Sequence, residues 1–245
     1  SFPTRRSSDL KPPAVFVVGN VVKLREEMRW FDNRPLFGKR IIVTRSRSQA
    51  SRLVTVLDQK GAETLEIPTI AIRDPSDDFK GMDEALDRLE MYDWLIFTSQ
   101  NGVDSFFRRL YQSGRDTRAL GHMKIGAIGP ATARQLTRHG LHADCVPAKY
   151  KAENLLAEMK PLLKGYEKVL MPRAKVARSV LPEGLRDLGC RVDVVEAYRT
   201  EADTAHKEEL LDVLEHHGAD IITFTSSSTV MDSPPMPLET KIPTR

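Results

Sequence analysis

The apolar positions of the chain follow two alternating patterns. Short runs rich in β-branched and aromatic residues are typical of buried strands, and between them apolar residues recur at helical spacing. The predicted strands are Ile41–Thr44, Leu65–Ile67, Ile70–Arg73, Trp94–Phe97, Lys124–Ile128, Val169–Met171, Val192–Tyr198 and Ile221–Thr225. The predicted helices are Ala50–Leu57, Val103–Leu110, Pro130–Gly140, Asn154–Leu163, Pro182–Leu188 and Glu208–Leu214. This alternation predicts an α/β fold with parallel sheets that helices cover on both faces.

Two parts of the chain resemble each other in order and spacing. Arg40–Arg45 resembles Lys168–Arg173 at an offset of 128 residues, and Ile96–Ser99 resembles Thr223–Ser226 at an offset of 127. A repeat of this kind predicts two similar β/α units. The counterpart of Gly126–Thr132 would fall beyond residue 245, so we expect the second copy to be truncated.

Composition and charge narrow the class of protein. The 245 residues are 40% hydrophobic and 29% charged with a net charge of +3, which favours a packed core and argues against a nucleic-acid-coating protein. The two cysteines show no disulfide or metal-ligand spacing, and no glycine-rich nucleotide loop is present. The chain has neither a secretory signal nor an apolar run of membrane length. We therefore expect a cytoplasmic protein with no metal and no cofactor.

Candidate chemistry lies where the predicted strands end. The junctions Thr44–Ser46, Thr98–Gly102, Gly129–Thr132, Pro172-Arg173 and Thr225–Ser228 are small, hydroxyl-bearing or basic, and each is predicted to open a helix. Backbone N–H groups at a helix start bind carboxylates or phosphates, and ligands of parallel sheets bind at this edge. Each serine or threonine is equally an ordinary helix N-cap, and each arginine a surface ion pair, so both interpretations stay open.

Four segments of the chain, taken together and in order, resemble the uroporphyrinogen-III synthase family. They are Phe37–Arg45, Trp94–Val103, Ala127–Ala133 and Val195–Thr200, and the resemblance extends over residues 38–230. Upstream, Pro13–Val22 and the residues up to Gly38 resemble the end of uroporphyrinogen-III C-methyltransferase, which is fused to the synthase in some bacterial proteins. The resemblance therefore implies an upstream methyltransferase domain in the same parent chain.

The resemblance implies two doubly wound parallel-sheet, flavodoxin-like domains joined by a two-stranded ribbon. Residues 38–74 and 201–245 would form the first domain, which is incomplete because the family's closing strand and helix are absent after Ser228. Residues 75–200 would form the second domain with the ribbon, and residues 11–37 the methyltransferase tail and linker. Residues 1–10 match the translation of a sequencing adapter and are interpreted as an assembly artefact.

The implied reaction cyclises hydroxymethylbilane to uroporphyrinogen III, with loss of water and inversion of ring D, in haem, sirohaem and cobalamin biosynthesis. Tyr198 matches the family's functional tyrosine, and we hypothesise that its phenol assists departure of the hydroxyl group. Alternatively, its ring only packs between the domains. The substrate-binding candidates are Arg45, Thr98, Ser99, Asn101, Gly102, Thr132, Arg173, Thr225 and Ser226.

The implied partner is the small-molecule substrate, with no nucleic acid and no membrane. Two other interpretations remain open. The chain is an inactive fragment of a bifunctional methyltransferase and synthase, or it is a two-lobed module that binds anions without catalysis, because doubly wound domains host many functions.

Overall fold

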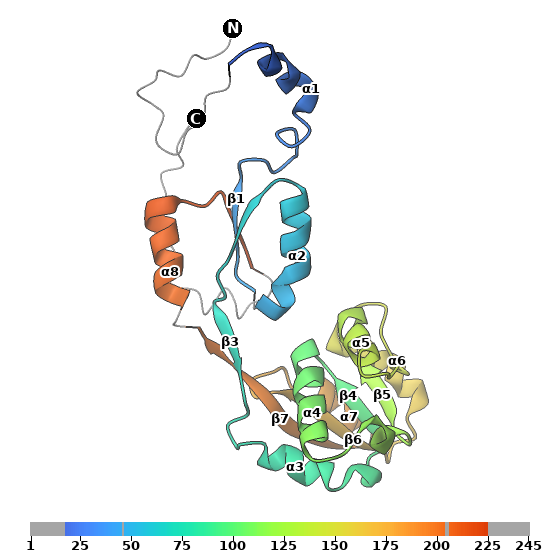
Figure 1. Cartoon of the computed structure of the whole chain (residues 1–245). Helices are drawn as coiled ribbons and strands as arrows, with labels where there is room; N and C mark the ends of the chain where they lie inside the picture. The colour runs from blue at the N-terminus through green and yellow to red at the C-terminus, as the bar shows by residue number, and fades with distance from the viewer. Residues whose placement is uncertain (1–17, 46, 204–205, 225–245) are drawn as a thin grey trace. The chain divides into compact units, whose positions relative to one another are not determined.

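The computed structural model describes residues 18–45, 47–203 and 206–224 (Figure 1). Contacts between residues divide the chain into two compact units. Residues up to Thr69 and those from Thr204 onward make up the first unit, and Ile70–Asp203 make up the second. Within the described ranges, no helix has the length and apolar character needed to cross a bilayer.

The second unit is built on a five-stranded sheet in the order β3-β7-β6-β4-β5. Its strands are β3 (Ile70–Arg73), β4 (Trp94–Phe97), β5 (Lys124–Ala127), β6 (Lys168–Ala174) and β7 (Arg191–Ala202). The last four run parallel to one another, whereas β3 pairs antiparallel with the end of β7. The bounds of β3 and β4 confirm the sequence prediction, and β7 continues four residues beyond its predicted end.

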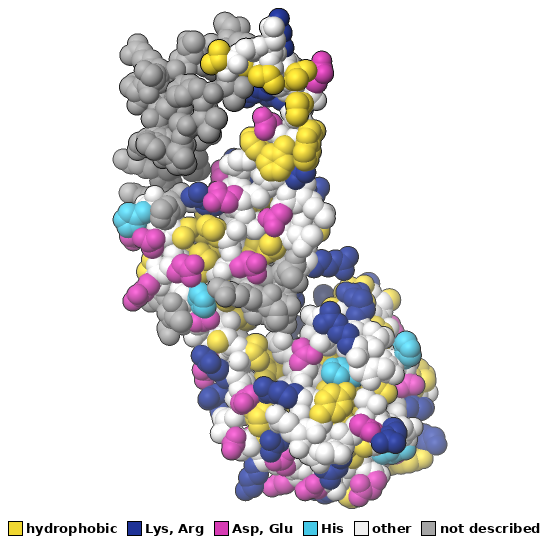
Figure 2. Space-filling view, viewed as in Figure 1, with side chains coloured by type: hydrophobic (Ala, Val, Ile, Leu, Met, Phe, Trp, Pro, Cys, Tyr) yellow, Lys and Arg dark blue, Asp and Glu magenta, His cyan; other side chains and the backbone are white. Residues whose placement is uncertain are grey.

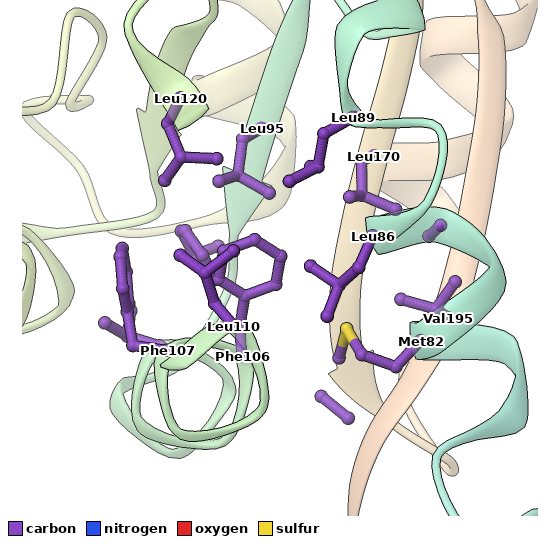
Figure 3. Close-up of a cluster of buried hydrophobic side chains, with 14 of the residues drawn as sticks. Met82, Leu86, Leu89, Leu95, Phe106, Phe107, Leu110, Leu120, Leu170 and Val195 are labelled. Carbon is purple, nitrogen blue, oxygen red and sulfur yellow. The ribbon is translucent and has the colours of Figure 1, made fainter. Parts of the chain in front are cut away.

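Successive side chains of a strand point to opposite faces of the sheet, and in these strands the side chains on both faces are apolar. Helices therefore cover both faces. The helices are α3 (Lys80–Leu86), α4 (Gln100–Gln112), α5 (Pro130–Thr137), α6 (Ala152–Met159) and α7 (Val180–Asp187), with 3₁₀ turns at Leu89–Met91, Thr117–Leu120 and Lys160–Leu162. Leu95 and Phe97 of β4 pack with α3 and α4, whereas Trp94 and Ile96 pack with α6 and α7. Figure 3 shows the first of these cores, where Leu95 and Leu110 point toward the same interior.

The first unit contains a three-stranded parallel sheet in the order β2-β1-β8. Its elements are β1 (Arg40–Val43), α2 (Arg47–Gln59), β2 (Glu63–Glu66), α8 (Lys207–Asp212), a π-helical turn (Val213–His217) and β8 (Ile221–Thr223), preceded by a 3₁₀ helix (Asn20–Leu24) and α1 (Arg25–Met28). The order β2-β1-β8 matches the order β7-β6-β4 of the second unit. These are the strands that the sequence repeat equates, β1 with β6 and β8 with β4.

One predicted junction is wrong. Pro172 and Arg173 do not open a helix, because β6 continues through both residues to Ala174 and α7 begins only at Val180. Pairing with β7 sustains the strand, since Pro172 lies opposite Val195. β4 pairs with β6 no further than Leu170, so the missing N–H of the proline lies beyond the β4 ladder.

Candidate functional site

The carboxyl ends of β4 and β6 meet at the centre of the second sheet, where the chain changes direction. From β4 it enters α4 on one face and crosses to β5, whereas from β6 it enters α7 on the other face and crosses to β7. Ligands of open parallel sheets bind at such a topological switch point. Thr98, Ser99, Asn101 and Gly102 directly follow β4, so four of the candidate residues lie at this position.

Ser99 starts α4 as its N-cap. The backbone of Ser99 is extended, and its Oγ accepts the Gly102 N–H at 3.0 Å, which satisfies one of the N–H groups that a helix start leaves without a partner. The position of Gly102 leaves little room for a side chain. A Cβ there would lie 3.0 Å from the Pro172 carbonyl oxygen and 3.2 Å from Ser99 Oγ, so the start of α4 is packed directly against the end of β6.

Tyr198 reaches this helix start from β7. Its side chain is buried, with 7% exposure, and its hydroxyl donates to Ser99 Oγ at 2.9 Å. Ser99 Oγ therefore accepts two hydrogen bonds, from an amide and from a phenol. Both of its lone pairs are occupied, so its own hydrogen is left to donate to a third group.

Arg173 is the buried cation of the site. It lies near the end of β6 with 6% exposure, and its Nη2 donates to the Arg178 carbonyl oxygen at 2.6 Å. Burial lowers the pKa of Arg173 because the charged guanidinium loses its water, and the proximity of Tyr198 opposes the shift. In the part of the chain that the structure describes, Arg173 has no carboxylate within ion-pair distance. The site thus holds a desolvated positive charge that a carboxylate ligand could neutralise.

Thr132 lies in the first turn of α5, which follows β5 and has Gly129 as its N-cap. The two helix starts are joined, because Gln100 Nε2 donates to the Ala131 carbonyl oxygen at 3.3 Å. The side chain of Thr132 is buried. Thr132 therefore lies one strand away from Ser99, along the same carboxyl edge of the sheet.

The remaining candidates belong to the first unit. Arg45 follows β1 there, at the position the repeat equates with Arg173. Thr225 and Ser226 lie outside the described residues. The candidates that the structure brings together therefore lie in the second unit, at the carboxyl ends of β4, β5 and β6 and within β7.

Two features of the site escape sequence analysis. Ser105 of α4 is buried and donates to the carbonyl oxygen of Ala197, next to Tyr198; its only signal is a hydroxyl within an otherwise apolar helix face. A hollow of about 270 Å³ also adjoins the antiparallel pair formed by β3 and the end of β7, and it is lined by Ala174, Lys175, Val176, Arg199, Thr200 and Glu201. It opens beside Ala174, the partner of Tyr198 across the β6–β7 ladder.

Within the described ranges, no group of three or more His, Cys, Asp or Glu side chains is arranged to hold a metal ion. Neither cysteine is a ready nucleophile. Burial raises the pKa of both the Cys145 and the Cys190 thiol, so neither carries the thiolate on which cysteine reactivity depends.

Comparison with known proteins identifies the family. The family profile of uroporphyrinogen-III synthase HemD matches residues 51–232. The chain belongs to the uroporphyrinogen-III synthase family. This family consists of lyases of porphyrin biosynthesis. Three of the four sequence segments, those from Trp94 onward, lie within the matched residues, and the match confirms the family that they resemble.

Two relatives and one solved structure show how far the likeness extends. The porphyrin biosynthesis protein HemD of Ruminiclostridium josui is 34% identical over 222 residues, which are 91% of this chain but 44% of that protein. A putative uroporphyrinogen-III synthase of Methanothermobacter thermautotrophicus is 37% identical over 77% of this chain and 74% of its own length. A mutant uroporphyrinogen III synthase from the extremely thermophilic bacterium Thermus thermophilus is 22% identical, with a TM-score of 0.58 over 80% of this chain and 75% of that chain. The structural match supports the α/β fold with mainly parallel sheets.

Proposed function

We propose that this chain cyclises hydroxymethylbilane to uroporphyrinogen III in the cytoplasm, with loss of water and inversion of ring D. The observation that carries the proposal is the hydrogen bond between Tyr198 and Ser99 at the switch point of the sheet. It holds a phenol at the edge where ligands of this fold bind, beside a helix start and a buried arginine.

The reaction needs a proton donor and a fixed geometry. The hydroxyl group of the substrate leaves as water when its oxygen takes up a proton while the C–O bond breaks, and loss of the pyrrole N–H proton then leaves an electrophilic azafulvene. We assign the proton to the Tyr198 phenol. Ser99 is the acceptor that holds this phenol in place until the substrate oxygen replaces it.

Ring closure must then begin at the substituted α-carbon of ring D, which gives a spiro intermediate. The bond from this carbon to the methylene that links it to ring C then breaks, and that methylene bonds to the free α-carbon on the other side of the ring nitrogen, which loses its proton. Direct closure at the free α-carbon would instead give the uninverted type I product. Both positions belong to the same ring, so the outcome depends on how the linear substrate is bent. We propose that Arg173 and the N–H groups that start α4 and α5 hold its carboxylates, with Thr98, Asn101 and Thr132 as further contacts. Arg45, Thr225 and Ser226 would bind carboxylates from the first unit.

We further propose that the two units are flavodoxin-like domains. We also propose that residues 11–37 form the end of an upstream methyltransferase domain. In the described part of this segment, residues 18–37, apolar side chains are exposed, including Met28 at 65% and Trp30 at 66%, and Figure 2 shows hydrophobic side chains gathered there. Exposed apolar patches of this kind mark contacts with another protein surface. The Ruminiclostridium relative is more than twice as long as the segment matched. Reduced fluorescence quenching of Trp30 in a longer parent chain would support this arrangement, and unchanged quenching would contradict it.

The proposed activity is tested by supplying freshly prepared hydroxymethylbilane and separating the type I and type III products by chromatography. We expect type III product from the wild-type chain. Y198F should lower kcat for this product by about 10²–10⁴, the usual contribution of a general acid. Type I product alone, formed at the spontaneous rate, would refute synthase activity of this chain and leave the inactive fragment and the anion-binding module.

Y92F is a matched control. The buried Tyr92 hydroxyl donates to Asp193 Oδ2 at 2.7 Å, and burial is the main cause of its raised pKa. Tyr92 precedes β4, at the opposite end of the strand from Ser99. Y92F should therefore lose a buried hydrogen bond but keep its turnover per folded molecule. Full type III turnover by Y198F would remove the acid role from Tyr198.

A further inference from the structure

Tyr198 owes its orientation to an irregularity in β7. Arg173 of β6 lies opposite Glu196, but the next residue, Ala174, lies opposite Tyr198, so Ala197 is an extra residue in the ladder. Such an insertion is a β-bulge. Ala197 and Tyr198 are consecutive, yet both belong to the core between the sheet and α4. In a regular strand their side chains would point to opposite faces, so without the bulge Tyr198 would turn away from α4.

The bulge is held by the same helix that holds the phenol. An extra residue leaves the ladder disrupted, and a buried carbonyl without a partner is costly. Ala197 is fully buried, and its carbonyl oxygen accepts the Ser105 hydroxyl of α4. Beyond the bulge the ladder resumes, because the Lys175 N–H donates to the Tyr198 carbonyl oxygen at 3.1 Å.

We propose that Ser105 is a positioning residue for Tyr198, an inference that rests on the proposed function of that tyrosine. Two hydroxyls of α4 bind consecutive residues of β7: Ser105 binds the Ala197 carbonyl, and Ser99 binds the Tyr198 phenol. Because one helix carries both, their separation is fixed, and the phenol lies at Ser99 only while the bulge stays at Ala197. The Ser105 hydroxyl is taken up by the Ala197 carbonyl oxygen, so it acts through Tyr198 and not by contact with substrate.

Loss of the Ser105 hydroxyl has a specific consequence. The Ala197 carbonyl would be left buried without a donor, and the chain could recover a partner by shifting the bulge along β7. A shift of one residue reverses the face to which Tyr198 points. The tyrosine would then leave Ser99 although the fold and the substrate contacts remain.

The test compares S105A with S105T, which keeps the hydroxyl, and with S113A as a matched control. Ser113 lies just after α4, where its Oγ donates to the Leu110 carbonyl oxygen at 2.8 Å, far along the helix from Tyr198. We expect S105A to lower kcat for type III product at least tenfold with little change in KM. S105T should recover most of this activity, and S113A should match the wild type. In a Y198F background, S105A should have no further effect on kcat.

A second measurement does not depend on turnover. In protein labelled with ¹³C at tyrosine Cζ, the Tyr198 resonance, assigned from Y198F, should move in S105A and stay unchanged in S113A. If that resonance moves but the wild type makes no type III product, the proposed function fails and the positioning role stands. An unmoved resonance with wild-type kcat in S105A would overturn the inference, as would equal losses with and without Tyr198. If S105A does not fold, S105C carries the same test, because a thiol is only a weak donor.

Discussion

Replacement of Gly102 by alanine should destabilise the second unit, although the same change in most helices is stabilising. Alanine is favoured over glycine inside a helix by about 0.5–1 kcal/mol. At Gly102 the added Cβ would lie 3.0 Å from the Pro172 carbonyl oxygen and 3.2 Å from Ser99 Oγ. The first atom is backbone in a central strand and the second is the N-cap of α4, so neither moves without loss.

The size of the effect follows from these two contacts. Forcing an extra methyl group into a packed site costs about 1–3 kcal/mol. If Ser99 rotates away to make room, the lost cap adds about 1 kcal/mol. After the gain in helix propensity, G102A should be less stable than the wild type by about 1–3 kcal/mol. Because Ser99 also holds Tyr198, turnover per folded molecule should fall as well.

Urea unfolding followed by far-ultraviolet circular dichroism measures the difference, with G81A as the matched control. Gly81 lies in α3, and an added Cβ there would lie 3.1 Å from Asp77 Oδ2, which accepts the Gly81 N–H at 2.9 Å but is the end of a flexible, exposed side chain. G81A should be neutral or more stable by up to about 1 kcal/mol. A G102A protein at least as stable as G81A would refute the close packing of α4 on β6.

Two further changes test the charges of the second unit. R173M should raise the KM for hydroxymethylbilane at least tenfold, and an unchanged KM would exclude Arg173 from substrate binding. The same change should leave the chain about 1 kcal/mol more stable toward urea, because it removes a buried charge that has no carboxylate partner in the described residues. Burial lowers the pKa of His139, whose ring stacks on Phe107 at 4.1 Å between centroids. Because the unfolded chain then takes up the proton first, the wild type should lose stability as pH falls below 6.5, the ordinary value. H139F should reduce that loss between about pH 7.5 and 5.5, and urea midpoints with the same pH dependence in both proteins would contradict this cause.

The sequence allowed the elements of the site to be predicted, but not all of their contacts. The strand Trp94–Phe97 is apolar throughout because both faces of the sheet are covered, and the serine that follows is a typical N-cap. These are local properties, and the structure has both as predicted. The repeat likewise anticipated that β1 and β6 occupy equivalent places in their sheets.

What could not be predicted depends on pairing between distant strands. Pro172 and Arg173 interrupt the apolar pattern and suggest the end of a strand, yet their partners in β7 extend it. The bulge at Ala197 exists only in the register between β6 and β7, and no local pattern contains that register. Tyr198 could therefore be chosen as a functional candidate from its resemblance, but its bond to Ser99 could not be foreseen.

The arrangement separates two tasks that the proposed reaction requires. The bulge and the two hydroxyls of α4 determine where the Tyr198 phenol lies, and this phenol acts when water departs. Arg173 and the helix starts would instead determine how the carboxylated chain is bent before ring closure. Damage to the first group should therefore slow turnover with little change in the isomer formed, because the bend is kept. Damage to the second should raise the proportion of type I product, because a chain that the protein does not position closes at the free carbon of ring D. The two tasks would not be separate if variants in the first group and variants in the second group both lowered the turnover rate and both raised the proportion of type I product.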